Sequence, residues 1–283
     1  MSDNPYLPGT SPDISFGKIY KFLREVRAEY TWMAGNAYSE FGFNQIDLAA
    51  SFALPVTYDP QHPLLVTPGF TTYFLTSPDT AAGGPAELYD AYLDGQWNPQ
   101  FAPWLGAELG VRVGVYSDFE NVVGDSIRIT GRGEAVFNFS PAFQVKAGIL
   151  YLDRDLIKML PAGGIVWTPN SDVRFDLLFP DPKISHRLWG TGTVDWWIYA
   201  RGEYGGDDWT MSGHWTPNGF LSGPIQRVDY NDIRVALGVE FTRYGGMKGN
   251  LEVGGAFDRQ IYTTAGITDS PGSVVFLRGG LAF

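Results

Sequence analysis

The chain has 283 residues, with 31 acidic and 20 basic side chains, a net charge of −11 and no cysteine. The lack of cysteine excludes disulfides, thiolate metal sites and cysteine nucleophiles. The acidic balance, without any basic run, argues against nucleic acid as a partner, because phosphate contacts need clustered lysine and arginine.

The composition predicts a protein that meets hydrocarbon on its surface. Aromatic residues make up 15% of the chain and charged residues only 18%, which is low for a water-exposed surface but typical of membrane barrels. No stretch approaches 18 consecutive apolar residues, so a transmembrane helix is excluded and a closed β-barrel is the remaining spanning structure. The first residues lack the basic and apolar regions of an export signal, which predicts a mature chain whose signal has been removed.

The chain is expected to begin with an irregular lead-in or plug over residues 1–22, which contains three prolines, followed by a barrel over residues 23–283. Fourteen segments of the second part read as strands. They lie near 24–35, 44–55, 64–75, 86–97, 103–117, 126–139, 142–153, 162–168, 171–179, 182–189, 193–212, 228–243, 247–262 and 272–283. If the pairing across 160–190 is not real, twelve strands remain.

Each segment alternates apolar and polar residues with the period of a strand, which a helix would mix. The clearest case is 103–116, where Leu105, Leu109 and Val113 share one face, and Glu108 and Arg112 share the other. The pattern predicts apolar side chains outside and polar side chains inside. The last segment ends on Phe283 and resembles the closing strand of bacterial outer-membrane barrels.

The connections between the segments alternate in length. Short turns are expected at 98–100, 140–141, 168–171 and 244–246, where proline or glycine supplies the backbone angles of a tight turn. Longer loops are expected near 77–85, 118–125, 154–161, 215–227 and 263–272. Short turns at one end and long loops at the other are typical of outer-membrane barrels, and an even strand number places both termini in the periplasm.

Aromatic residues gather near the predicted turns, as at Trp97, Trp104, Phe139 and Trp189. In a membrane barrel this clustering indicates a girdle at the interface between lipid and water.

Under the predicted alternation, eleven cationic and twelve anionic side chains point inwards, so the interior is nearly neutral. The anionic set includes Asp90, Asp94 and Asp258. The side chains expected to line a pore are Glu108, Arg112, Arg128, Arg132, Glu134, Lys146, Arg174, Arg201, Arg234, Glu240 and Arg278.

The segments 160–169 and 177–188, read as LPAGGIVWTP and LLFPDPKISHRL, resemble a motif of uncharacterised porin-like outer-membrane proteins of planctomycete-type bacteria. The motif covers roughly a tenth of the chain, and the strand layout after it is similar too. The resemblance implies a location and a fold, but no activity and no functional residue.

The predicted function is passive diffusion of small polar solutes through an outer-membrane channel in contact with lipid. The alternative is a plugged structural barrel that anchors another envelope component, and self-association is an open prediction. A lipase is disfavoured, since the neighbours Ser185 and His186 would point to opposite faces of a strand. Asp207 and Asp208 in a turn lack a calcium-loop motif. We therefore predict no enzyme activity and no cofactor. A soluble β-sandwich is the alternative fold.

Overall fold

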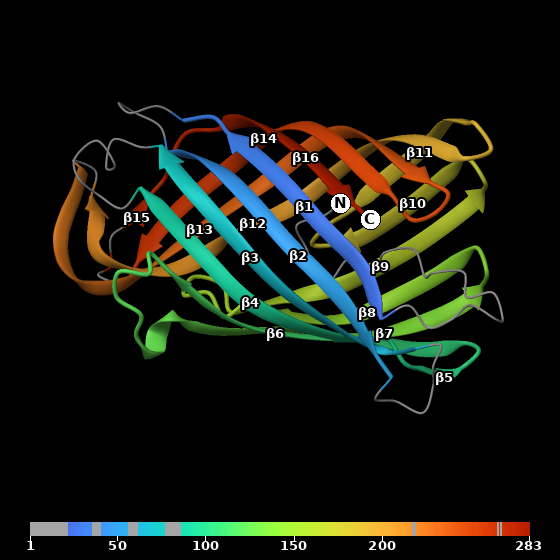
Figure 1. Ribbon diagram of the computed structural model, residues 1–283, viewed down its shortest axis with the longest axis horizontal. Helices are drawn as coiled ribbons and strands as arrows, with labels where there is room; N and C mark the ends of the chain where they lie inside the picture. The colour runs from blue at the N-terminus through green and yellow to red at the C-terminus, as the bar shows by residue number, and fades with distance from the viewer. Residues whose placement is uncertain are drawn as a thin grey trace.

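The computed structural model describes residues 22–35, 41–55, 62–76, 86–216, 219–264, 266 and 268–283. These residues form one closed antiparallel barrel of fourteen wall strands (Figure 1). The wall strands are β1 (Leu23–Met33), β2 (Gly42–Leu54), β3 (Leu64–Thr76), β4 (Glu87–Trp97), β6 (Leu105–Ser117), β7 (Ile127–Ser140), β8 (Phe143–Tyr151), β9 (Met159–Asn170), β10 (Val173–Phe179), β11 (Lys183–Gly190), β12 (Val194–Thr216), β13 (Gly219–Arg243), β14 (Lys248–Thr263) and β16 (Val274–Ala282).

Three short elements lie outside this ring. β5 (Gln100–Ala102) pairs with β6, β15 (Thr268–Asp269) pairs with β14, and the 3₁₀ turn η1 (Gly124–Ser126) precedes β7. The prediction of fourteen strands is confirmed, because β9, β10 and β11 pair in sequence across the region that was in doubt. The predicted lead-in or plug lies outside the described residues, apart from Phe22.

The barrel closes between its first and last strands. β1 pairs antiparallel with β16 from Arg27–Ala282 to Met33–Phe276, and β16 pairs in turn with β14. The start of β1 and the end of β16 therefore lie at the same end of the barrel. We call this end the turn end, because it also carries the short connections 141–142, 171–172, 191–193 and 244–247.

The outside of the barrel is apolar, as the alternation predicts. Every wall strand exposes at least one large apolar side chain: Val26, Leu48, Phe70, Leu93, Val111, Ile129, Ile149, Trp167, Leu177, Ile184, Ile198, Leu237, Leu251 and Leu277. On β16, Val275 and Leu277 are exposed while Phe276 and Arg278 are buried. Aromatic side chains gather at the turn end, where Phe139 stands 70% and Trp189 55% exposed.

The opposite end, which we call the loop end, differs from the prediction. Residues 215–227 were expected to form a loop, yet β12 has 23 residues and β13 has 25, so they form one long hairpin that pairs from Val194–Arg243 to Thr216–Gly219. In Figure 1 this hairpin projects beyond the wall at the left. The loop predicted at 154–161 ends earlier, because β9 begins at Met159.

The hairpin bends because its wall neighbour is short. β11 has 8 residues and its pairing with β12 ends at Arg201, so the rest of β12 has no partner on that side. An unpaired strand edge seeks another partner. Gly206 has φ +104°, where a side chain would collide with the backbone of Tyr230, so glycine permits the bend.

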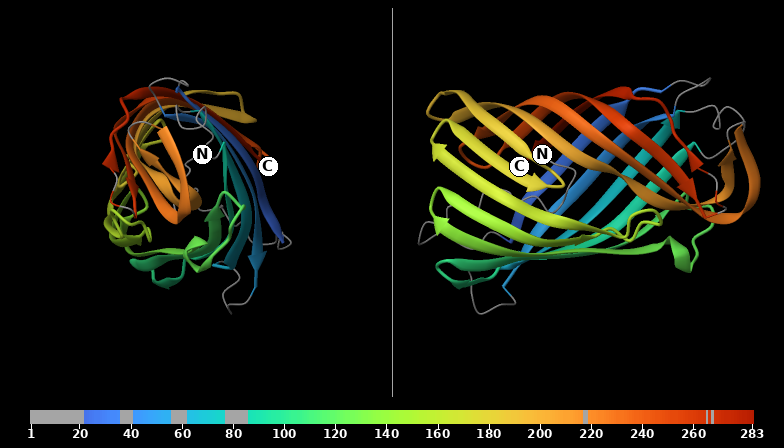
Figure 2. Two further views of the ribbon diagram at one scale, coloured as in Figure 1. Left: turned by 90° about the vertical axis from the view of Figure 1, so that its left-hand side faces the viewer. Right: turned by 180° about the vertical axis from the view of Figure 1, so that it is seen from behind.

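The far part of β12 crosses the mouth and reaches the opposite wall. Thr210 pairs in parallel with Ser117 of β6, and the N–H of Asp118 donates to the Thr210 carbonyl at 3.2 Å. This contact bypasses β7–β11 and closes a smaller ring of nine strands: β6, β4, β3, β2, β1, β16, β14, β13 and β12. Seen end-on in Figure 2, the hairpin lies within the outline of the barrel.

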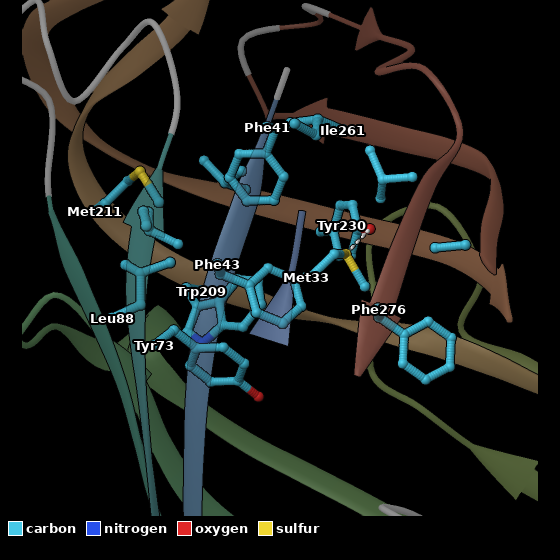
Figure 3. Close-up of a cluster of buried hydrophobic side chains, with 14 of the residues drawn as sticks. Met33, Phe41, Phe43, Tyr73, Leu88, Trp209, Met211, Tyr230, Ile261 and Phe276 are labelled. Carbon is cyan, nitrogen blue, oxygen red and sulfur yellow. Dashed lines mark hydrogen bonds between the residues drawn. The ribbon is translucent and has the colours of Figure 1, made fainter. Parts of the chain in front are cut away.

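Apolar side chains fill this narrowed end. Trp209, Met211 and Val228 of the hairpin pack among buried residues of the wall strands, including Phe43 and Leu88 (Figure 3). The Tyr73 ring meets Trp209 edge-on, with 5.0 Å between ring centroids. Among the described residues, the larger apolar cluster of the barrel thus lies at its loop end. We call residues 207–229 of the hairpin the cap.

One residue predicted inside lies outside. β14 contains a bulge between its pairs with Asn231 and Ile233, and Asp258 within it has φ 46°. The bulge reverses the alternation, so Asp258 is exposed and Arg259 is buried at 1% exposure.

Candidate functional site in the barrel lumen

The interior face of β6–β8 carries a compact group of charges. Glu108 accepts from Arg132 at 2.8 Å and from the Lys146 ammonium at 2.6 Å, and Arg132 lies 3.2 Å from Glu134. β6 and β7 pair so that Glu108 lies directly beside Glu134, which brings these side chains together on the interior face. Four of the side chains predicted to line a pore therefore form one network.

A second group lies on the interior face of the neighbouring strands from β1 and β16 to β12. Arg278, which is 1% exposed, lies 2.9 Å from Glu203, 3.2 Å from Glu252 and 3.7 Å from Glu29. Glu203 also pairs with Arg201 and, at 3.2 Å, with Arg234. Because these partners come from five consecutive strands, β1, β16, β14, β13 and β12, the network ties one side of the ring together. We call these two groups of ion pairs the braced lumen.

Arg112, Arg174 and Glu240, which were also predicted to line a pore, have partners of opposite charge. Arg112 lies 3.4 Å from Asp94 and stacks 3.8 Å above the Tyr92 ring centre. Arg174 lies 2.8 Å from Asp176, and Glu240 lies 2.6 Å from the Lys183 ammonium. The pairs of Arg174 and Glu240 are half-buried, whereas those deeper in the lumen are buried.

Arg128, the last of the residues predicted to line a pore, contacts the hairpin as well as the lumen wall. Its guanidinium binds Asp208 of the cap, which also accepts from Arg227 at 2.6 Å. Arg227 lies 2.9 Å from Asp155 of the β8–β9 connection. Asp208 thus ties the cap to β7, and Arg227 of the cap ties it to the β8–β9 connection.

Hydrogen bonds complete the attachment of the cap. Thr210 shares a 2.6 Å hydrogen bond with Ser126, and the Asn121 amide donates to Ser212 at 2.9 Å. Arg154 donates to the carbonyl of Gly205 and to the side chain of Asn231, each at 2.9 Å. The cap is therefore held on one side by β6–η1 and on the other by the β8–β9 connection.

A cavity of about 150 Å³ lies between the cap and the braced lumen. Asp47 forms one wall and accepts from Arg27 at 2.8 Å, Thr71 at 2.8 Å and Tyr92 at 3.0 Å. The Tyr92 ring lies over Gly69, where any Cβ would collide with it. On the cap side, the Trp209 indole donates to Asp90 at 2.6 Å. The enclosed space is polar on several walls and aromatic on others.

Sequence reasoning missed the residues that attach the cap. Asp208 was placed in a turn but lies in β12, and Arg154, Arg227 and Arg259 were not placed inside at all. The alternation of inward and outward side chains is broken by the bend in the hairpin and by the bulge in β14, and Arg154 lies in a connection between strands. The signals that could have located them are the glycines at 202, 205 and 206, which mark the bend.

Among the described residues, those weighed from the sequence as candidates for hydrolysis or metal binding do not form such a site. Ser185 is buried inside β11 while His186 is exposed outside, so this pair cannot share a hydrogen bond. His214, expected near a loop, lies in β12. Within the described ranges, no group of three or more histidine or acidic side chains could hold a metal ion.

The closed fourteen-strand barrel defines the structural class of the protein. Solved structures that it resembles include a bacterial polysaccharide outer membrane secretin, with 10% identity, 94% of this chain and 99% of the other covered, and a TM-score of 0.41. LpxR from Salmonella typhimurium has 9% identity over 92% of this chain and 99% of its own, with a TM-score of 0.42.

The siderophore receptor PirA from Pseudomonas aeruginosa has 8% identity, 92% and 80% coverage, and a TM-score of 0.26. At these scores the likenesses carry no argument about function. No family model and no curated protein matches the chain. Across the described residues, no helix is long and apolar enough to cross a membrane.

Proposed function

We propose that the protein is a β-barrel of the bacterial outer membrane that passes small polar solutes and is closed at its loop end by the cap in this conformation. The observation that supports the proposal is a charged interior with a cavity directly beneath a hairpin that crosses the mouth. The resemblance to porin-like proteins of planctomycete-type bacteria stays a prediction.

The membrane location is supported by the outer surface. Large apolar side chains stand exposed around the whole ring, as with Val111 at 50%, Leu237 at 61% and Leu251 at 60%. A water-exposed surface of this kind would be costly, whereas hydrocarbon accommodates it, and a closed barrel leaves no unpaired backbone edge in lipid. Exposed aromatic side chains at the turn end suit the interface with water.

The orientation follows from the connections. The turn end holds the start of β1 and the end of β16, and short turns of such barrels face the periplasm. Both termini are then periplasmic, and the cap faces outwards. The solute would enter past the cap and leave through the turn end.

Passage requires the cap to separate from β6. Its polar attachments at this wall are a strand pair and a few hydrogen bonds, among them Thr210 to Ser126 and Ser212 to Asp118. Hydrogen bonds of this kind contribute about 0.5–1.5 kcal/mol each, because water replaces them when they break. The wall strands below remain fully paired through this change.

A disulfide lock tests the proposal directly, since the chain has no native cysteine. Ser117 and Thr210 are paired across strands, within the reach of a disulfide bond. Oxidised Ser117→Cys/Thr210→Cys protein should show no conductance in a planar lipid bilayer and no solute uptake in liposomes. Reduction should restore conductance to at least the level of the wild type.

The matched control is Asn138→Cys/Gln144→Cys, a pair joined within the wall near the turn end. Its oxidation should leave conductance unchanged. Equal conductance of the locked and reduced cap variants would refute the role of the cap. A further variant shortens the hairpin by joining Gly205 to Asp232 through Asn-Gly, which removes the cap. The channel function would be refuted if this variant, the wild type and the reduced cysteine variant all lacked conductance.

The second candidate is a structural barrel that anchors another envelope component. The observation in its favour is the apolar packing at the mouth, where Leu88, Met211 and Val228 are fully buried. A permanently filled mouth would support this candidate over the channel. The same bilayer experiment separates the two, because only the channel responds to the lock.

A further inference from the structure

The cavity beneath the cap has an uneven charge. Four arginines line it: Arg27, Arg112, Arg154 and Arg234. Five carboxylates line it as well: Asp47, Asp90, Asp181, Glu203 and Asp207. Three of the arginines are already held in ion pairs by carboxylates of the wall. The charge balance of the cavity therefore depends on the few groups outside these pairs.

Asp90 and Asp207 are the carboxylates that stand apart. In the described part of the chain, neither forms a salt bridge: Asp90, 3% exposed, accepts from Trp209, and Asp207 accepts from the N–H of Asp208. The two carboxylates act on each other electrostatically. The nearby guanidinium of Arg154 donates to two carbonyls and an amide rather than to a carboxylate. The arginines that act electrostatically on Asp90 and Asp207, among them Arg112 and Arg154, are thus bound directly to other groups.

Aromatic rings form the rest of the wall next to Asp90. Tyr73 and Trp209 meet edge to face, and Phe43 meets Tyr73 at 5.7 Å between ring centroids. Arginines already occupy the neighbourhood of Tyr92 and Tyr204, at 3.8 Å and 5.6 Å from the ring centres. Aromatic faces attract cations, most strongly when both are shielded from water.

The volume sets the size of a ligand. A buried water needs about 10–15 Å³ of such space, so the cavity holds on the order of ten waters or a solute of similar size. Burying two carboxylates that have no direct ion pair is costly, and a bound cation would reduce that cost.

From these observations we infer that the cavity binds a small organic cation of the ammonium class, with Asp90 and Asp207 as counter-charges and Trp209 and Tyr73 as the aromatic wall. The identity of this cation as a transported solute rests on the proposed channel function. The binding of the cation in the cavity does not depend on that function.

The first experiment measures binding of tetramethylammonium chloride to the detergent-solubilised barrel by calorimetry, with sodium chloride at equal ionic strength as the reference. Saturable binding with one site is expected. Asp90→Asn should weaken it at least tenfold, and Asp90→Asn/Asp207→Asn should abolish it. Asp172→Asn, a change at an exposed carboxylate in the β9–β10 turn, should leave the affinity unchanged.

The melting temperature of each variant in detergent shows that the barrel is folded. If a variant fails to fold, Trp209→Phe, which keeps an aromatic face but loses the hydrogen bond to Asp90, should weaken binding severalfold. Absence of saturable binding to the wild type, or equal affinity of the wild type and the Asp90 variant, would overturn the inference.

The second experiment separates this inference from the channel proposal. A gradient of tetramethylammonium chloride across a bilayer should give a cation-selective reversal potential, and Asp90→Asn/Asp207→Asn should shift it towards zero. Binding without any conductance would uphold the site and refute the channel. Conductance without binding or cation selectivity would uphold the channel and refute the site.

Discussion

The braced lumen and the cap fill the same barrel in two different ways. In the braced lumen, charged side chains of nearby wall strands pair with one another on the interior face, as with Arg278 and Glu203 at 2.9 Å. In the cap, Trp209, Met211 and Val228 pack against apolar residues of the wall. The ion pairs of the braced lumen depend on partners at fixed positions. The apolar packing of the cap depends instead on how well its side chains fill the space at the mouth.

This difference separates a permanent part of the barrel from a part that can move. An ion pair in the lumen cannot lose one partner without leaving a buried charge, so its strands are fixed together. The cap is attached to the wall at β6 and β7 by one strand pair, several hydrogen bonds and the single ion pair of Asp208 with Arg128. Changes in the two regions should therefore have different consequences for stability and for passage.

The largest effect is expected for Arg278→Met in the braced lumen. The change leaves Glu203 and Glu252 with less positive charge around them, and breaking a buried pair in this way costs about 3–5 kcal/mol. Urea unfolding of the lipid-reconstituted barrel, followed by tryptophan fluorescence, measures the loss. A cost below that of Arg187→Ala would contradict the proposed bracing.

A loss of similar or smaller size is expected for Met211→Ala in the cap. Met211 is fully buried in the apolar cluster, and such a truncation costs about 2–5 kcal/mol. Because the cluster closes the mouth, this variant should also raise conductance, while Arg278→Met should not do so through the cap. Single-channel recording provides this comparison, and lower conductance in Met211→Ala would count against the cap as a barrier.

Thr210→Val should have an intermediate effect. The substitution keeps the shape but removes the hydroxyl that bonds Ser126 and the Tyr116 carbonyl, and an unsatisfied buried group costs about 1–3 kcal/mol. The expected result is more frequent opening with little change in urea stability of the wall. Opening statistics identical to those of the wild type would show that this contact does not hold the cap.

The smallest effect is expected for Arg187→Ala. Its guanidinium pairs with Asp195 near the turn end and is 34% exposed, and pairs of this kind contribute about 0–1 kcal/mol. Urea stability and conductance should both stay close to those of the wild type. A loss above 2 kcal/mol would mean that bracing extends to the turn end.

Much of the fold follows from the sequence, because strand alternation is a local property. The period-two pattern at 103–116 placed Leu109 and Val111 outside and Glu108 and Arg112 inside, as the structure shows. The fourteen strands were predicted with small errors at their ends. The role of the eleven predicted lining residues in a pore stays a prediction, although each of them lies in an ion pair.

The errors arise where the alternation is interrupted. Asp258 and Arg259 exchange sides at a bulge, which one extra residue creates without any mark in the composition. The hairpin at 215–227 was predicted as a loop, since polar and glycine residues there resemble a connection.

The sequence by itself determined which face of each strand is apolar, the number of strands and the absence of cysteine chemistry. Only the tertiary structure decided that the loop end narrows to nine strands and encloses a cavity. The physical reason is that β12 bends towards β6 because β11 is too short to pair with β12 beyond Arg201. That contact joins Ser117 to Thr210, residues far apart in the chain, and no local pattern specifies it.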